Sequence, residues 1–328
     1  MNKKYIVGIA ATIAIATFYI FNASWRVSPI APELRLLSHR GVHQTFHRQG
    51  LTNTTCTAAR IDSPTHGFIE NTIPSMRAAF TAGADVVELD VHPTTDGYFA
   101  VMHDWTVDCR TEGSGETRSH DLAYLKSLDL GYGYTADDGK TFPLRGQGIG
   151  LMPELGEVFA TFPDKKFLIN FKSRESREGD MLAEFVTQHP QWRPAVWGVY
   201  GGDEPTWRAA ELFDDDLVAF SRASVKTCLK QYLALGWSGY MPEACRNSMV
   251  ILPIDIAPWL WGWPHLLVQR FQNAGSEIAL LGPMLDKDAG APGIDTLDHL
   301  ALVPEEFSGY LWTDKIEIIG PAVRELQK

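Results

Sequence analysis

The feature that most constrains the fold is the alternation of short, branched apolar runs with stretches of helical spacing. The runs that read as strands are Leu36–His39, Val86–Val91, Phe99–His103, Phe167–Lys172, Ala195–Tyr200, Leu217–Ser221, Glu277–Leu281 and Gly309–Thr313. Helices are expected between most of them, at Ile73–Ala82, Asp121–Leu128, Glu154–Thr161, Ser176–Thr187, Thr206–Leu212, Val225–Leu235, Trp261–Asn273 and Pro321–Leu326. Such alternation is typical of βα units around a parallel sheet. We therefore predict an α/β fold of the TIM-type (β/α)8 barrel class, with a doubly wound sheet as the second choice.

The interval between the second and third runs does not fit a regular barrel. It extends only from Val91 to Phe99, which is too short for a crossover helix between parallel strands. Thr95, Asp96 and Gly97 look instead like a tight turn. The barrel is therefore predicted to be irregular between strands 2 and 3. If the two runs form a local hairpin, a carboxylate of the second lies roughly opposite the histidine that ends the third.

Another stretch, Met249–Ile254, resembles a strand that the eight-unit pattern does not place. Pro253 interrupts it, and an aromatic cluster of Trp259, Trp261 and Trp263 follows. Packing within the core or a loop is the favoured interpretation of this cluster, and a membrane-facing belt is the alternative.

The chain is long enough for residues 33–328 to form one barrel domain, because α/β barrels of roughly 250 residues are common. Hydrophobic residues make up 45% and charged residues 21%, which is ordinary for a globular protein. With 40 acidic against 29 basic residues, the net charge of −11 argues against nucleic acid as a partner. A substrate phosphate would have to be attracted by a local cation or a metal ion.

Residues 1–24 are interpreted as a signal anchor or a signal peptide. Lys3 and Lys4 precede an almost unbroken apolar run, Ile6 to Phe21, so residues 5–21 are expected to enter a membrane. The anchor is favoured over the cleaved peptide. Because basic residues tend to stay in the cytoplasm, the rest of the chain is expected on the extracytoplasmic (periplasmic) side, or secreted to that compartment if the segment is cleaved.

An oxidising compartment would allow the four cysteines to form disulfides in one of three connectivities. Cys56–Cys109 with Cys228–Cys245 is preferred, since the second pair encloses one short helix-like segment and the first ties down two loops that flank the proposed site. Buried free thiols are the alternative.

Ionisable residues end or line three of the predicted strands, where barrels place their active sites. Glu88 and Asp90 share one face of an otherwise apolar strand, and buried carboxylates are costly unless they are paired or bind a metal. Their oxygens suit one hard divalent cation, Ca²⁺ or Mg²⁺. His39 and His103 each terminate an apolar strand and can serve as a proton acceptor and a proton donor to a phosphodiester. Like most of the other histidines, His43 has no special setting.

Competing chemistry finds little support, because the chain has no G-x-S-x-G elbow and no glycine-rich phosphate loop. The ordered motifs instead resemble the glycerophosphodiester phosphodiesterase family, whose members are phosphatidylinositol-phospholipase-C-like TIM-barrel phosphodiesterases. The residues that carry this resemblance are His39-Arg40-Gly41, Glu70-Asn71-Thr72, Gly83-Ala84-Asp85, Glu88-Leu89-Asp90-Val91, Asp96-Gly97, His103-Asp104, Thr106, Leu128-Asp129, Pro153-Glu154-Leu155-Gly156-Glu157-Val158, Asn170-Phe171-Lys172 and, weakly, Gly309 with Thr313-Asp314. The resemblance covers residues 36–175 well and the remainder loosely.

The resemblance implies roles for particular residues. His39 and His103 would be the acid/base pair, and Glu88, Asp90 and Glu157 would bind the divalent cation. Other positions that it assigns to the substrate side of the site are Arg40 and Lys172, which would face the phosphate, and Glu70 and Asn71 at the rim, where Glu70 would complete the metal environment or hold the His39 loop.

The implied activity is hydrolysis of glycerophosphodiesters to glycerol 3-phosphate and an alcohol, with a small-molecule or lipid-derived substrate. The alternatives are a phospholipase acting on lysophospholipid or phosphatidylinositol, and a catalytically silent envelope binding protein.

The chain departs from the family pattern in three places. The stretch 42–69 is longer than usual and is expected to reshape the pocket or form a lid. Asn170 stands where a glutamate is common, which removes one negative charge and predicts weaker metal binding. Leu281-Gly282-Pro283 replaces a familiar Trp-Thr pair, for which Trp312 is expected to compensate.

Overall fold

The computed structural model describes the whole chain except residues 1–2, 29–32, 53, 214–216, 285–291 and 328. The strands of the described part are β1 (Leu34–His39), β2 (Val86–Pro93), β3 (Phe99–Val101), β4 (Lys166–Phe171), β5 (Val196–Gly201), β6 (Val218–Ser221), β7 (Met249–Pro253), β8 (Glu277–Leu281) and β9 (Gly309–Thr313). Its α-helices are α1 (Lys3–Phe21), α2 (Ile73–Ala82), α3 (Leu122–Ser127), α4 (Leu155–Thr161), α5 (Arg177–Gln188), α6 (Asp203–Leu212), α7 (Arg222–Leu235), α8 (His265–Gln272), α9 (Leu297–Leu300) and α10 (Ile316–Leu326).

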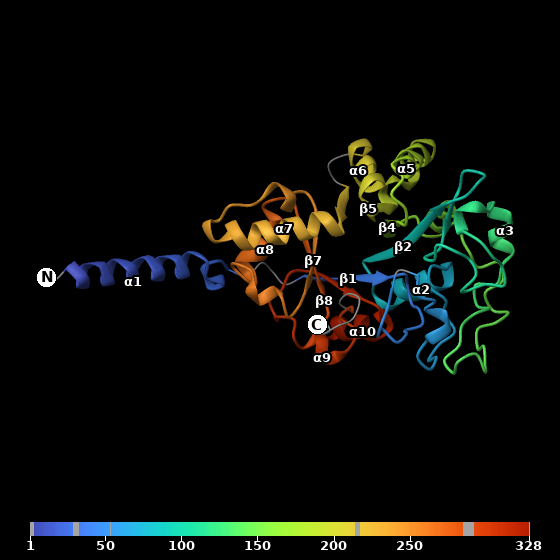
Figure 1. Cartoon of the computed structure of the whole chain (residues 1–328), viewed down its shortest axis with the longest axis horizontal. Helices are drawn as coiled ribbons and strands as arrows, with labels where there is room; N and C mark the ends of the chain where they lie inside the picture. Colours follow the sequence, from blue (N-terminus) through green and yellow to red (C-terminus); the bar gives the residue numbers. More distant parts are fainter. Residues whose placement is uncertain (1–2, 29–32, 53, 214–216, 285–291, 328) are drawn as a thin grey trace.

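The strands form a nearly closed barrel in the order β6-β5-β4-β2-β1-β9-β8-β7, with helices around it (Figure 1). Neighbours along this path pair in parallel, and β6 and β7 at its two ends also contact each other. The predicted TIM-type barrel is therefore confirmed.

The irregularity between strands 2 and 3 is a hairpin. Among the described strands, β3 pairs with β2 and runs antiparallel to it, with His92 opposite Ala100, so Phe99–His103 is a hairpin return and not the barrel strand that the pattern predicted. The loop is too short to cross the barrel, and only an antiparallel return is open to it. The eighth barrel strand is β7, which is the Met249–Ile254 stretch that the sequence pattern left unplaced.

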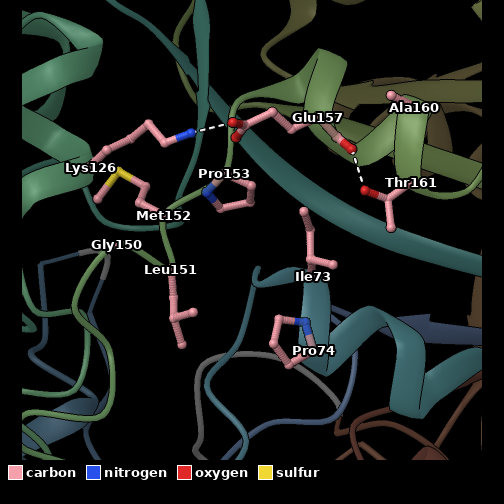
Figure 2. A pocket seen from close by; sticks show the side chains of 10 residues that line it. All are labelled: Ile73, Pro74, Lys126, Gly150, Leu151, Met152, Pro153, Glu157, Ala160 and Thr161. Carbon is pink, nitrogen blue, oxygen red and sulfur yellow. Dashed lines mark hydrogen bonds and ion pairs between the residues drawn. The ribbon is translucent and has the colours of Figure 1, made fainter.

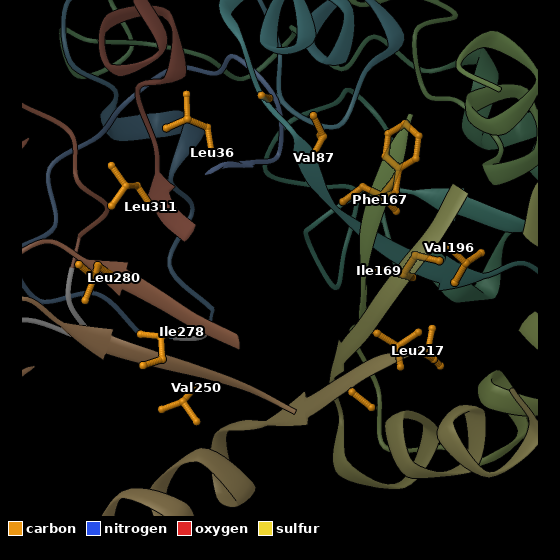
Figure 3. Packing of buried hydrophobic residues seen from close by; sticks show 14 of the residues in the cluster. Leu36, Val87, Phe167, Ile169, Val196, Leu217, Val250, Ile278, Leu280 and Leu311 are labelled. Atoms are coloured by element: carbon orange, nitrogen blue, oxygen red, sulfur yellow. The ribbon is translucent and has the colours of Figure 1, made fainter. Parts of the chain in front are cut away.

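Alternation along the strands separates two apolar layers. Leu36, Val87 and Phe167 face outward and pack beneath the surrounding helices (Figure 3). Their neighbours Leu37 and Val86 belong to a different cluster, which also contains side chains from β6 to β9 and fills the barrel interior. Because residues two apart share a face, the side chains of His39, Glu88 and Asp90 also face this interior.

A third apolar cluster lies under the long loops and includes Ile69, Val107, Tyr134 and Leu144. The Cys56–Cys109 disulfide joins these loops, with the Cα atoms 5.5 Å apart. A second disulfide, Cys228–Cys245, ties α7 to the 3-10 turn Glu243–Cys245. Both preferred pairings are thus present, and Ala58, Ile61 and Ile69 of the stretch 42–69 pack into the third cluster.

Helix α1 extends away from the barrel in Figure 1. Its C-terminal end is attached to the body, because the Phe18 ring lies 5.6 Å from the ring of Trp237 and 5.3 Å from that of Trp261. In the part of the chain that the structure describes, no helix combines the length and the apolar character needed to cross a membrane. The aromatic cluster is split, since Trp261 and Trp263 pack against the core while 77% of Trp259 is exposed.

Candidate active site

The carboxyl ends of β1, β2, β4, β5 and β9 bring polar side chains together inside the barrel rim. The strand register places His39 beside Glu88, Asp90 beside Asn170, and Asn170 beside Tyr200. The parallel pairing aligns these strand ends, so residues far apart in sequence become neighbours.

Glu88 and Asp90 are fully buried at the centre of this group. The Tyr200 hydroxyl donates to Glu88 Oε1 at 2.6 Å, and the backbone N–H of Arg40 donates to Glu88 Oε2 at 3.1 Å. Asn71 Nδ2 donates to Asp90 Oδ2 at 2.9 Å, and Asn71 Oδ1 accepts from the backbone N–H of Asp90 at 3.1 Å. These bonds supply the partners that buried carboxylates require.

The environments of the two carboxylates differ. Burial and the nearby Asp90 raise the pKa of Glu88. Burial also opposes ionisation of Asp90, but Lys172 and Arg40 outweigh it and hold the pKa of Asp90 well below its usual range. Lys172 Nζ lies 3.3 Å from Asp90 Oδ1, and Arg40 Nε lies 3.3 Å from Asp90 Oδ2. Both predicted phosphate-facing cations therefore lie beside Asp90.

Glu70 contacts cations and orients the loop after β1. Its carboxylate lies 3.0 Å from Arg40 Nη1 and 3.1 Å from Arg110 Nη1. Burial opposes ionisation, but Arg110 and Arg40 outweigh it and lower the pKa of Glu70 to about 2. Gly41 follows with φ +77°, and a Cβ there would lie 2.3 Å from Ser75 Oγ, so the tight turn requires glycine.

Each of the two predicted acid/base histidines is paired with an aspartate through Nδ1. His39 Nδ1 lies 2.6 Å from Asp314 Oδ1, and His103 Nδ1 lies 2.7 Å from Asp104 Oδ1. Arg110 Nε donates to the other oxygen of Asp104 at 2.8 Å. Since Nδ1 is occupied, Nε2 is the ring nitrogen left for chemistry in both rings.

The two imidazoles titrate differently. Burial and Arg40 disfavour the charge on His39, but Glu88 and Asp314 outweigh them and raise its pKa. Burial, Arg40 and Lys172 lower the pKa of His103 to about 4. Pairs of groups whose pKa values are pushed apart are a frequent property of acid/base sites.

Three contributors were not predicted from the sequence as site residues. Tyr200 ends β5 and bonds to Glu88, and Asp314 directly follows β9 as His39 ends β1. Their position at strand ends was the available signal, although only the barrel register shows which ends meet. His43, which had no special setting in the sequence, is buried, and its Nε2 lies 3.9 Å from Asp314 Oδ1.

The structure does not bring the predicted metal ligand Glu157 to Glu88 and Asp90. Its carboxylate pairs with Lys126 and accepts from the backbone N–H of Glu154 at 2.9 Å in a capping box that starts α4. Both side chains line a separate surface pocket of about 440 Å³ (Figure 2). The groups of acidic and histidine ligands that converge among the described residues do not include Glu157 with Glu88 and Asp90.

Asn170, rather than Glu157, lies beside the carboxylates of Glu88 and Asp90. Its Nδ2 donates to Asp90 Oδ1 at 2.8 Å and to the Tyr200 hydroxyl at 3.0 Å. A divalent cation fits the Glu88–Asp90 pair by the chemistry of the donors, because two like charges are buried side by side and carboxylate oxygens bind hard cations. The third side chain beside this pair, Asn170, is a neutral amide and adds no negative charge to the site.

Comparison with known proteins agrees with this geometry. Residues 39–189 match the model of the glycerophosphoryl diester phosphodiesterase family. The matched region resembles that family.

Curated glycerophosphodiester phosphodiesterases are similar to part of the chain. One from Caldanaerobacter subterraneus is 42% identical over 103 residues, covering 31% of this chain and 39% of that protein. One from Bacillus subtilis is 38% identical over 117 residues, covering 34% and 39%. A lysophospholipase D from Mus musculus is 31% identical over 137 residues, covering 40% of each chain. The aligned part spans about two-fifths of each relative's length.

Solved structures of glycerophosphodiester phosphodiesterases share the fold. An enzyme from Agrobacterium tumefaciens aligns with a TM-score of 0.56 at 18% identity, over 89% of this chain and 100% of that chain. A phosphodiesterase from Oleispira antarctica, solved with the product sn-glycerol-3-phosphate, aligns with a TM-score of 0.55 at 17% identity, over 90% and 97%.

Proposed function

We propose that this protein hydrolyses glycerophosphodiesters to glycerol 3-phosphate and an alcohol. The observation that carries the proposal is the convergence of two His–Asp pairs on one buried carboxylate cluster, with His39 beside Glu88 and His103 close enough to Asp90 to interact with it electrostatically. The names of its curated relatives and the product bound to the Oleispira antarctica protein support the same substrate class.

The two imidazoles act as the acid/base pair. His39 Nε2 lies 3.8 Å from Glu88 Oε2, so the ring is directed at the centre of the site. With Nδ1 of each ring held by an aspartate, one Nε2 accepts a proton from the attacking oxygen and the other donates a proton to the leaving alkoxide. Proton transfer by positioned side chains contributes roughly 10²- to 10⁴-fold to such reactions.

Arg40 and Lys172 bind the phosphate group of the substrate. Both cations already lie 3.3 Å from a carboxylate oxygen of Asp90, so the buried Arg40 and the half-buried Lys172 are in place at the site. Glu70 fixes Arg40 from the other side. A planar guanidinium and a compact ammonium can together hold the oxygens of a phosphodiester.

Glu88 and Asp90 would hold one divalent cation, Ca²⁺ or Mg²⁺. When bound, the ion neutralises charge on the phosphoryl oxygens. Asn71 and Tyr200 keep the two carboxylates in place through their hydrogen bonds.

Lysophospholipids are the second candidate substrate class, since a relative is named as a lysophospholipase D. The test is release of glycerol 3-phosphate from glycerophosphocholine by the purified full-length chain in mild detergent, after EDTA and then with added Ca²⁺ or Mg²⁺. Metal-restored turnover that falls at least about 100-fold in His39→Ala and His103→Ala is expected, while His47→Ala in an exposed loop serves as the control.

Faster cleavage of lysophosphatidylcholine than of glycerophosphocholine would favour the second candidate. Absence of turnover with either substrate and every cation would overturn the proposal and leave a silent binding protein.

The N-terminal segment and both disulfides support an extracytoplasmic location for the barrel. A C-terminal alkaline phosphatase fusion tests this location, because that reporter folds only in an oxidising compartment. Activity of the fusion is the expected result.

A further inference from the structure

A second cluster of metal-binding groups lies next to the carboxylate pair, between the ends of β1 and β9. It consists of His39, His43 and Asp314, and one ligand atom from each falls within 4.8 Å of the other two. The rings of His39 and His43 meet edge to face, with centroids 5.8 Å apart. The cluster differs from the Glu88–Asp90 pair because two of its three ligands are nitrogens.

His43 is the unusual member, because its imidazole is buried without a hydrogen bond that explains it. Only 2% of the side chain is exposed. Its Nδ1 has no hydrogen-bond partner among the residues that the structure describes, and its Nε2 lies 3.9 Å from Asp314 Oδ1, which is beyond hydrogen-bond distance. A buried polar ring without partners is costly, and one that faces a carboxylate and a second imidazole has the disposition of a metal ligand.

The other two residues complete an open coordination site. Asp314 Oδ2 is held by Arg48 Nη1 at 3.2 Å, which leaves Oδ1 facing the two rings. The side chain of His39 is 21% exposed, so a small ion can reach the cluster from solvent. Two imidazoles and one carboxylate with a free position suit Zn²⁺, which prefers nitrogen ligands in tetrahedral sites, rather than Ca²⁺ or Mg²⁺.

We propose that His39, His43 and Asp314 form an inhibitory Zn²⁺ site. Zn²⁺ takes the place of the proton that His39 Nδ1 and Asp314 Oδ1 share, and that proton passes through solvent to His39 Nε2, so the ring stays neutral. The proton of the neutral His39 ring then resides on Nε2, so this nitrogen can no longer accept one. Inhibition rests on the proposed function, whereas Zn²⁺ binding does not.

Binding is tested by isothermal titration of the metal-stripped full-length chain with Zn²⁺ in detergent, with excess Mg²⁺ occupying hard oxygen sites. The wild-type chain is expected to bind one Zn²⁺ at this cluster, and His43→Gln to bind it roughly 100-fold more weakly. His47→Gln removes a nearby histidine with 69% of its side chain exposed and is the matched control, expected to bind as the wild type does. Equal affinity of wild type and His43→Gln would overturn the site.

X-ray absorption of the Zn²⁺-loaded wild type gives a readout that needs no variant. It should show two nitrogens and oxygen ligands at about 2.0–2.2 Å, and a shell of oxygens alone would overturn the assignment. In the hydrolysis assay, micromolar Zn²⁺ should inhibit the wild type and His47→Gln but spare His43→Gln. If the enzyme hydrolyses its substrate and binds Zn²⁺ without being inhibited, the inhibitory role is overturned. If no hydrolysis is observed, the result of the Zn²⁺ binding experiment still stands.

Discussion

Asn170 donates a hydrogen bond from Nδ2 to Oδ1 of Asp90 at 2.8 Å, across the parallel strands β4 and β2. The amide therefore occupies the place where a third carboxylate would complete a cation site with Glu88 and Asp90. It relieves repulsion between buried acids at the cost of one ligand charge.

Replacing this amide with a carboxylate should strengthen cation binding. Asn170→Asp is expected to lower the Kd for Ca²⁺ by about tenfold, equivalent to about 1.4 kcal/mol. Without the ion, the extra buried charge beside Asp90 should lower stability by about 2 kcal/mol. Calcium titration calorimetry and thermal unfolding with and without Ca²⁺ measure both effects. Asn273→Asp, an exposed change of the same charge, is the control, and identical Ca²⁺ affinity in both variants would contradict the prediction.

Removing the charge of Asp314 should disable His39. Asp314→Asn keeps the size of the side chain but no longer favours a proton on His39 Nδ1, so kcat is expected to fall by about 10²- to 10⁴-fold with a smaller change in KM. Steady-state kinetics on glycerophosphocholine measure this fall. Asp298→Asn, at the start of α9, should leave kcat unchanged. A kcat within threefold of wild type in Asp314→Asn would show that the pair has no role in turnover.

Glu70 should contribute to acid stability. Its pKa in the folded chain is about 2, against an ordinary value of 4.5. A depressed carboxyl pKa stabilises the fold fully above about pH 4.5, and this contribution disappears as the pH falls through about 2. Glu70→Gln leaves Arg40 and Arg110 without their shared carboxylate and should cost about 3 kcal/mol at pH 7.

The difference in Tm between wild type and Glu70→Gln is therefore expected to be constant above pH 5 and to shrink toward pH 2. Thermal unfolding followed by circular dichroism across this range measures it. A difference that stays constant down to pH 2 would mean that the cost of the substitution is packing and not charge.

The two disulfides should differ in their contribution to stability. Cys56–Cys109 closes a separation of 53 residues and Cys228–Cys245 one of 17. On chain entropy alone, replacing the first pair by serines should cost about 1 kcal/mol more than replacing the second. Urea unfolding of the two double variants measures this difference. A larger loss for the shorter loop would indicate that strain or residual structure decides the contribution.

Local pattern in the sequence was enough for most of the elements and for part of the site. Apart from Phe99–His103, the strand and helix candidates correspond to helices and barrel strands of the structure, because apolar periodicity reports which face of a segment is buried. The short interval before Phe99 also predicted the hairpin, since chain length alone forbids a crossover there. The sequence also indicated four candidate site residues, because each ionisable group stands at the end of an apolar strand or within it. These residues are His39, His103, Glu88 and Asp90.

Tertiary structure decided the rest, because the remaining relationships join residues that are distant in the chain. Met249–Pro253 is a barrel strand only because β8 lies alongside it. The side chain of Glu157 lies apart from Glu88 and Asp90, because it caps α4 and pairs with Lys126. The partnership of Asp314 with His39 spans 275 residues and depends on β9 lying next to β1. No local periodicity encodes which strand ends meet around a barrel, so those contacts had to come from the closed sheet.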